Sequence, residues 1–273
     1  MSANLAVTFT DLVELSRPHV LAIGLVMTRI APATLLCPIF GGQAAPQTVR
    51  VALCLALAVH AHFGGDVNPS FGPSADIFTV LGAFARELFC GTVIGFIAAL
   101  PFDAARMGGR FLDTFRGANA ESSLPATGSK EAATGDLLHQ LLAAVAFGGV
   151  GYRLLAMSLL GSFRSAPLGL SAGFDTGLIA EHAITQATSA LATGLAIGAP
   201  AAAVSLLVDA AMGIAARAAP SLPIKDLGAP AKLLVGAAAI LISLGAISQR
   251  LLEELGRAAL ATDQVSALFG GLP

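Results

Sequence analysis

The longest uncharged stretch of this chain covers 27 residues, from His182 to Val208. A helix needs about 20 apolar residues to cross the hydrocarbon core of a bilayer. Shorter uncharged stretches occur along the rest of the chain: Ile30–Val49, Val51–Gly65, Leu88–Phe102, Leu137–Tyr152 and Leu233–Gln249. Charged residues make up 12% of the chain, against about 25% in an ordinary soluble domain. These features predict a membrane protein.

The apolar stretches also indicate which kind of membrane protein this is. They are continuous and rich in Ala, Leu and Gly, whereas the strands of a membrane barrel alternate in hydrophobicity over about 10 residues. In lipid every backbone amide must be hydrogen-bonded within the protein, which a helix achieves within one segment. We therefore expect an all-α, polytopic helical membrane protein, with residues 1–273 forming a single membrane domain.

Six hydrophobic helical regions are expected, several of them short or broken by proline. They lie near residues 12–36, 49–63, 77–100, 137–163, 178–214 and 229–250. Pro200 lies inside the fifth region, which predicts either one bent helix or a hairpin of two shorter helices. Asp11 and Glu14 precede the first basic residue, Arg17. A cleaved signal begins with a basic leader, so we expect the first helix to be retained.

The stretch 101–136 differs from these regions. Its first half predicts a short amphipathic helix, because charged residues recur at three or four positions and share one face: Asp103, Arg106, Arg110 and Asp113. Apolar residues occupy the opposite face: Phe102, Ala105, Leu112 and Phe115. Small and polar residues dominate the following segment, Gly117–Ser129, which cannot form a core of its own. That segment is either an exposed loop or a mobile segment that lies in a cavity or pore.

No pattern in the sequence is typical of catalysis or of a cofactor site. The motifs H-E-x-x-H, G-x-S-x-G and G-x-x-x-x-G-K-[ST] do not occur. The three cysteines, Cys37, Cys54 and Cys90, have no metal-ligand spacing with the five histidines. We expect them to be small buried side chains. We therefore expect no enzyme activity, no cofactor, no metal site and no nucleic-acid partner.

A few charged residues in or beside the apolar stretches are candidates for structural or assembly roles: Arg86, Glu87, Asp209, Arg217 and Lys232. An ionisable group at membrane depth is costly and usually faces protein or water. Asp209 could be a proton relay or a structural carboxylate bonded to a neighbouring helix or cation, and the second reading is favoured. Neighbouring residues on a helix point about 100° apart. We therefore expect Arg86 and Glu87 either to anchor their helix at the membrane interface or to pair with adjacent subunits.

Two glycine pairs have the small-xxx-small spacing that lets helices approach closely: Gly91 with Gly95, and Gly194 with Gly198. With 30 glycines in the chain, a few such pairs arise by chance. The spacing alone is therefore a weak signal of helix packing.

Taken in order, several motifs resemble one family. Arg29-Ile-Ala-Pro32 is followed by Pro38-Ile-Phe-Gly-Gly, and Arg86-Glu87 opens a helix with Gly91 and Gly95. Ala105–Asp113 is similar to a segment of that family in which a glycine is followed by an aspartate. A last block keeps the order and spacing of the family: Pro200, Asp209, Gly213, Arg217, Pro220 and Lys232. This set resembles the T subunit of the type III secretion export apparatus (the SctT family) and its flagellar relative FliR.

Two positions depart from the family pattern. The fourth helical region has Gly151-Tyr-Arg153 where the family often carries a histidine after glycine. In the Pro-Leu-Lys motif, Pro230 is kept but Ala231 replaces the leucine.

The resemblance implies a core inner-membrane subunit of an export gate for unfolded polypeptides, assembled with the R, S and U subunits in the bacterial inner membrane. It also implies that the loop after the third region forms part of a plug: Gly117, Ala118, Asn119, Ala120, Glu121, Ser122 and Ser123. The injectisome branch is favoured over the flagellar one. A small-molecule secondary transporter remains an alternative, although that class favours an internal repeat and mid-membrane ionisable residues, and neither is evident here.

Overall fold

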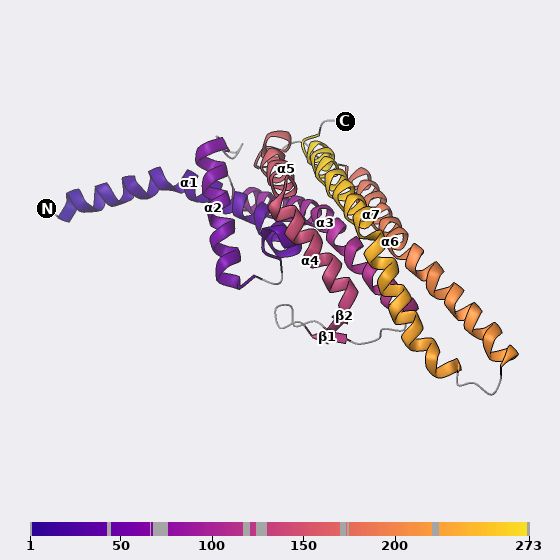
Figure 1. Cartoon of the computed structure of the whole chain (residues 1–273). Coiled ribbons are helices and arrows are strands. Elements are labelled where there is room, and N and C mark those ends of the chain that lie inside the picture. Colours follow the sequence, from indigo (N-terminus) through magenta and orange to yellow (C-terminus); the bar gives the residue numbers. More distant parts are fainter. Residues whose placement is uncertain are drawn as a thin grey trace. The chain divides into compact units, whose positions relative to one another are not determined.

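The computed structural model describes residues 2–42, 45–65, 67, 76–116, 121–123, 130–169, 173, 175–219 and 224–271. Its elements appear in chain order in Figure 1: α1 (Ser2–Leu36), η1 (Pro38–Phe40), α2 (Gln47–Gly65), α3 (Ile77–Arg116), β1 (Glu121–Ser123), β2 (Lys130–Ala132), α4 (Ala133–Gly148), α5 (Gly151–Ser165), α6 (Thr176–Ala218) and α7 (Ile224–Phe269). The predicted all-α class is confirmed. The small exception is β1, which pairs with β2 antiparallel so that Glu121 lies opposite Ala132.

Within the described residues, five helices are long and apolar enough to cross a membrane. They are Pro18–Leu36 of α1, all of α2, α3 and α6, and Pro230–Phe269 of α7. The count rises to six if α4 and α5 form one broken span. The prediction of a polytopic helical membrane protein is therefore confirmed by length and composition.

Fewer helices end at a proline than predicted. α3 continues through Pro101 to Arg116, so the predicted amphipathic helix is the second half of a longer one. α6 likewise continues through Pro200, which excludes the hairpin alternative. A proline removes one backbone hydrogen bond and crowds the preceding turn, but the intact turns on both sides keep these long helices continuous.

Two other boundaries were predicted incorrectly. The fourth region is two helices, because the chain leaves the helical conformation at Gly149 and Val150. α7 continues 19 residues beyond the predicted end at 250, to Phe269. Charged residues such as Glu253 and Arg257 end the apolar run there. The helix nevertheless continues, because buried residues recur at helical spacing beyond that point: Leu251, Leu255 and Ala258.

The chain divides into two compact units, each with its own core. Unit 1 comprises Met1–Ala99, Arg153–Ile184 and Ala259–Pro273, and unit 2 comprises Leu100–Tyr152 and Thr185–Ala258. The most buried large side chains of unit 1 include Leu25, Ile30, Ile94, Leu159 and Phe269. Those of unit 2 include Phe102, Leu112, Leu138, Ile197 and Leu251. The predicted cysteine burial is confirmed, since Cys37, Cys54 and Cys90 are all buried.

Glycines bring helices close together in both units. In unit 1, a Cβ on Gly91 would overlap the backbone carbonyl of Arg29, and one on Gly95 would lie 2.8 Å from Ala33 Cα. In unit 2, a Cβ on Gly194 would lie 3.0 Å from the carbonyl oxygen of Ala104, and one on Gly198 would overlap Phe111. Both small-xxx-small pairs therefore serve helix packing, α3 on α1 in unit 1 and α6 on α3 in unit 2.

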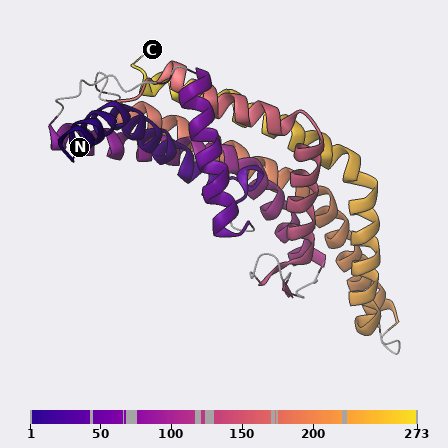
Figure 2. The same ribbon diagram turned by 90° about the vertical axis from the view of Figure 1, so that its left-hand side faces the viewer.

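Within unit 2, α6 and α7 lie side by side along their length, as the orange and yellow ribbons show in both views (Figure 1 and Figure 2). Their outward side chains are apolar and well exposed. Examples are Leu207 at 69%, Ile214 at 70%, Leu234 at 74% and Ile242 at 86%. Surfaces of this kind need a cover of lipid or protein.

Candidate functional site

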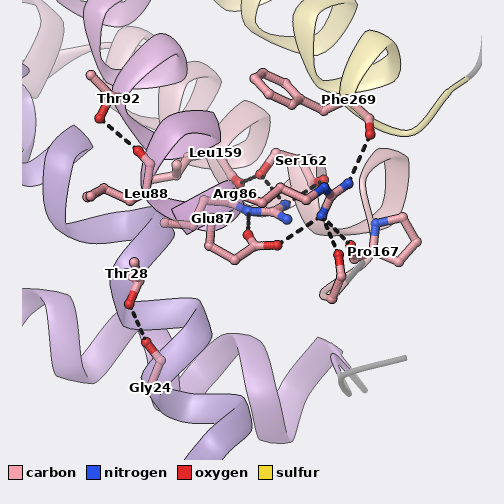
Figure 3. Close-up of polar contacts among 12 residues, drawn as sticks. Gly24, Thr28, Arg86, Glu87, Leu88, Thr92, Leu159, Ser162, Pro167 and Phe269 are labelled. Carbon is pink, nitrogen blue, oxygen red and sulfur yellow. Dashed lines mark hydrogen bonds and ion pairs between the residues drawn. The ribbon is translucent and has the colours of Figure 1, made fainter. Parts of the chain in front are cut away.

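Unit 1 contains a buried group of three charged residues, here called the Arg–Glu cluster: Arg29 of α1 with Arg86 and Glu87 of α3. Their exposed fractions are 0%, 5% and 0%. Glu87 accepts a hydrogen bond from Arg29 Nε on Oε2 at 2.5 Å and one from Arg86 Nη1 on Oε1 at 3.0 Å. Both carboxylate oxygens are therefore bonded to a guanidinium (Figure 3).

The excess positive charge of the Arg–Glu cluster is met by backbone carbonyls. Arg86 donates to the carbonyls of Pro167 at 3.1 Å, Gly169 at 2.9 Å and Phe269 at 2.9 Å (Figure 3). Arg29 Nη1 donates to the carbonyl of Ser162 at 3.0 Å. Ser162 lies in the last turn of α5 and Phe269 ends α7. Carbonyls at helix C-termini carry partial negative charge and lack helical partners, so they stabilise the second guanidinium.

The Arg–Glu cluster joins segments that are distant in sequence. Arg29 brings α1 to α3 and α5, and its guanidinium also lies 4.4 Å from the centroid of the Phe163 ring. Arg86 holds the segment after α5 and the end of α7. Buried charges are tolerated only when paired and hydrogen-bonded. The chemistry of this cluster is therefore that of a structural centre for unit 1.

The placement of Arg86 and Glu87 differs from both alternatives raised by the sequence. They are bonded to each other and to partners within the same chain, and they are too buried to anchor α3 at an interface or to reach another subunit. Their central partner, Arg29, was not predicted as a site residue. Its position inside an apolar stretch was the available signal, because an ionisable group there requires a partner.

A second polar group lies in unit 2 at the root of the segment 117–132. Asp113, near the end of α3, accepts hydrogen bonds from the backbone N–H of Thr134 at 2.9 Å and from its hydroxyl at 2.6 Å. Thr134 lies in the first turn of α4, where unpaired N–H groups favour an anion. Arg116 Nη1 donates to the Thr134 hydroxyl at 3.2 Å. Asp113 therefore caps α4 and holds both ends of the intervening segment.

Two glycines allow this contact. A Cβ on Gly109 of α3 would overlap the backbone of Gly135 in α4, and one on Gly135 would lie 2.9 Å from the carbonyl oxygen of Arg106. Asp113 is 3% exposed. The charged face of the predicted amphipathic helix is therefore buried at Asp113 and does not lie wholly in solvent. Its end is buried because the first turn of α4 covers it.

Replacing Asp113 with alanine is expected to destabilise the chain by about 0.5–2 kcal/mol, because the first turn of α4 loses its capping carboxylate. The amide of Thr134 should then exchange its hydrogen faster. Hydrogen exchange on the solubilised chain measures this effect directly. Thr114→Ala, which removes an exposed neighbouring hydroxyl, is the control, and equal exchange in the two variants would contradict the cap.

The remaining predicted residues lie on α6 and α7. Lys232 Nζ lies 2.5 Å from Asp209 Oδ1, and the two side chains are 25% and 47% exposed. Asp209 thus has a cationic partner on the neighbouring helix. Arg217 is exposed, and among the residues that the structure describes it forms no ion pair.

A further link between α6 and α7 was not predicted. Glu254, which is 4% exposed, accepts hydrogen bonds from Ser189 at 3.4 Å and Thr193 at 3.2 Å and pairs with Arg257 at 2.7 Å. Glu254 lies beyond residue 250, where this helix was predicted to end. The boundary error therefore hid this contact.

The predicted plug residues are only partly within the described chain. Gly117, Ala118, Asn119 and Ala120 lie outside it, whereas the backbone of Glu121, Ser122 and Ser123 forms β1. No group of three or more His, Cys, Asp or Glu side chains in the described ranges could hold a metal ion.

The fold and the internal charged contacts define a polytopic α-helical membrane protein held together by buried polar links. In a comparison with known families, residues 20–258 match the family described as bacterial export proteins, family 1. The chain belongs to this family of bacterial export proteins.

Three relatives show the branches of this family. The chain is 28% identical over 168 residues to Yop proteins translocation protein T of Yersinia pestis, covering 61% of this chain and 64% of that protein. It is 29% identical over 167 residues to secretion system apparatus protein SsaT of Salmonella typhimurium, with the same coverage. It is 25% identical over 225 residues to flagellar biosynthetic protein FliR of Bacillus subtilis, covering 82% and 86%. The match spans about 64% of the length of the secretion relatives. The predicted family resemblance is confirmed.

Proposed function

We propose that this chain is a core subunit of a type III protein export gate in the bacterial inner membrane. The observation that carries the proposal is the family match over residues 20–258, together with secretion-apparatus relatives at 28% and 29% identity. The subunit would help to form and close a channel for unfolded polypeptides. It would act without catalysis, as a structural and gating component.

The same function in a flagellar export apparatus is the second candidate. It is favoured by the alignment with FliR, which covers 82% of this chain. The slightly higher identity to the two secretion proteins supports the injectisome branch, which we prefer. Complementation of strains that lack either subunit distinguishes the two: restored secretion supports the first and restored motility the second.

We infer that the partners are the R, S and U export subunits. The exposed apolar side chains of α6 and α7, such as Leu234 and Ile242, support an assembly in which other helices cover this surface. Coexpression with those subunits should place the chain in a large hetero-oligomer on native gels. A chain that stays a monomer with all three present, and moves a small solute alone, would support the transporter alternative.

The segment Gly117–Ser123 is the proposed plug. The cap between Asp113 and Thr134 supports this assignment, because it fixes both roots of a segment whose sequence is dominated by small and polar residues. Deleting Gly117–Ser122 should leave the complex assembled and make the membrane permeable to ions. A scrambled segment of the same length is the control. Normal conductance in the deletion would refute the plug.

Asp209 is proposed to act in assembly through Lys232. Because this ion pair is partly exposed, Asp209→Ala should cost at most about 1 kcal/mol in the isolated chain, and the yield of assembled complex should fall more than the export rate per complex. Quantifying both in one strain tests this. Lys232→Ala should behave alike if the pair is the cause. Export abolished in fully assembled Asp209→Ala complexes would instead indicate proton transfer.

A further inference from the structure

Unit 1 has a half-open pocket of about 340 Å³ between the end of α2 and the second half of α5. This volume lies in the range of about 300–1,000 Å³ that small-molecule pockets occupy. Its wall is mainly apolar and includes Val67, Met157 and Leu160. Gly161 leaves space, because a Cβ there would have no atom within 4 Å.

Two polar side chains stand at this apolar pocket, His60 and Arg164. Both are exposed, and within the described chain Arg164 is bonded to no carboxylate. Its guanidinium is permanently cationic and matches the geometry of a phosphate. The imidazole of His60 supplies a further N–H donor. The pocket therefore offers a cation and a donor beside an apolar cavity, which fits an amphipathic anion.

The position of the pocket along α2 indicates where that anion would come from. α2 has 19 residues, or about 28 Å at 1.5 Å per residue, close to the roughly 30 Å of the hydrocarbon core. The pocket residues His60 to Gly65 form the last turns of α2. In a bilayer that α2 crosses along its whole length, these turns would lie at the level where lipid headgroups begin. Beside them Phe63 and Met157 are 67% and 63% exposed, so the cavity opens onto an apolar surface.

We propose that this pocket binds an anionic phospholipid. The phosphate contacts Arg164 and His60, and the first part of an acyl chain packs against Met157 and Leu160. The charge complementarity and the apolar wall together select this occupant over a soluble anion or an uncharged lipid. The site goes beyond the export role and does not depend on it.

Native mass spectrometry of the purified full chain tests the charge requirement. With added phosphatidylglycerol the chain should retain one lipid. With phosphatidylcholine retention should be about tenfold weaker, because its quaternary ammonium offsets the phosphate charge and repels the Arg164 guanidinium. Arg164→Gln should weaken phosphatidylglycerol binding by about tenfold or more. Arg153→Gln is the matched control, because Arg153 is an exposed arginine on the same helix outside the pocket.

A second pair of variants tests the cavity while every charge stays in place. Gly161→Leu fills the pocket and should abolish the retained lipid. Gly245→Leu is the control, because a Cβ on Gly245 of α7 also meets no atom within 4 Å but Gly245 does not line the pocket. The proposal is overturned if phosphatidylcholine binds equally well, if Arg164→Gln matches Arg153→Gln, or if Gly161→Leu retains the lipid. Crosslinks from position 164 to a partner chain that displaces the lipid in the assembled complex would overturn it too.

Discussion

Replacing Glu87 with alanine is expected to lower the free energy of unfolding of unit 1 by about 3–5 kcal/mol, the usual loss when one partner of a buried ion pair is removed. Glu87 is fully buried and is the carboxylate that contacts both Arg29 and Arg86. Without it two buried guanidinium groups lose the carboxylate with which both are paired. Denaturant titration of the solubilised chain, followed by circular dichroism, measures the loss.

The control for this variant is Glu253→Ala, because Glu253 is an exposed carboxylate on α7. Substitutions at such surface positions usually change stability by no more than about 0.5 kcal/mol. A double variant, Arg29→Met with Glu87→Leu, should recover part of the stability, since it replaces one buried ion pair with apolar groups while Arg86 keeps its backbone carbonyl partners. A loss below about 1 kcal/mol for Glu87→Ala would contradict a structural role for the Arg–Glu cluster.

The helical class of this protein is readable from sequence because it depends on local chemistry. Uncharged runs such as His182–Val208 indicate burial in lipid or protein, and four of the six runs lie within single helices of the structure. Helix ends were less predictable. The third region was predicted to end near residue 100, just before Pro101, and Pro200 to bend or split the fifth. The effect of a proline depends on the turns around it and on packing that the local sequence does not contain.

The polar contacts could be predicted only in part, because they join residues that are far apart in the chain. Arg29 and its partner Ser162 are separated by 133 residues, and Arg86 and Phe269 by 183. The sequence singled out Arg86 and Glu87 as charges that need partners, but nothing local identifies a backbone carbonyl as a partner. The Asp113 cap was missed for the same reason, since α4 begins 20 residues further along.

Alanine at Gly91 is expected to destabilise unit 1 by about 1–3 kcal/mol, the usual range for overpacking a core. A Cβ at this position would overlap the backbone carbonyl of Arg29. Backbone cannot rotate away as a side chain can, so α1 must move from α3. That movement also shifts the residue that carries the guanidinium bonded to Glu87.

The matched control is Gly245→Ala on α7, where a Cβ meets no atom within 4 Å. There the change should stabilise the helix by up to about 1 kcal/mol, because alanine has the higher helix propensity. A loss of stability for Gly91→Ala and a gain for Gly245→Ala, measured by denaturant titration, would show that the contact made by the added Cβ decides the outcome. Gly91→Ala combined with Glu87→Ala should cost less than the sum of the two, since both disturb the position of Arg29. Strict additivity would mean that the close approach of α1 to α3 and the Arg–Glu cluster act independently.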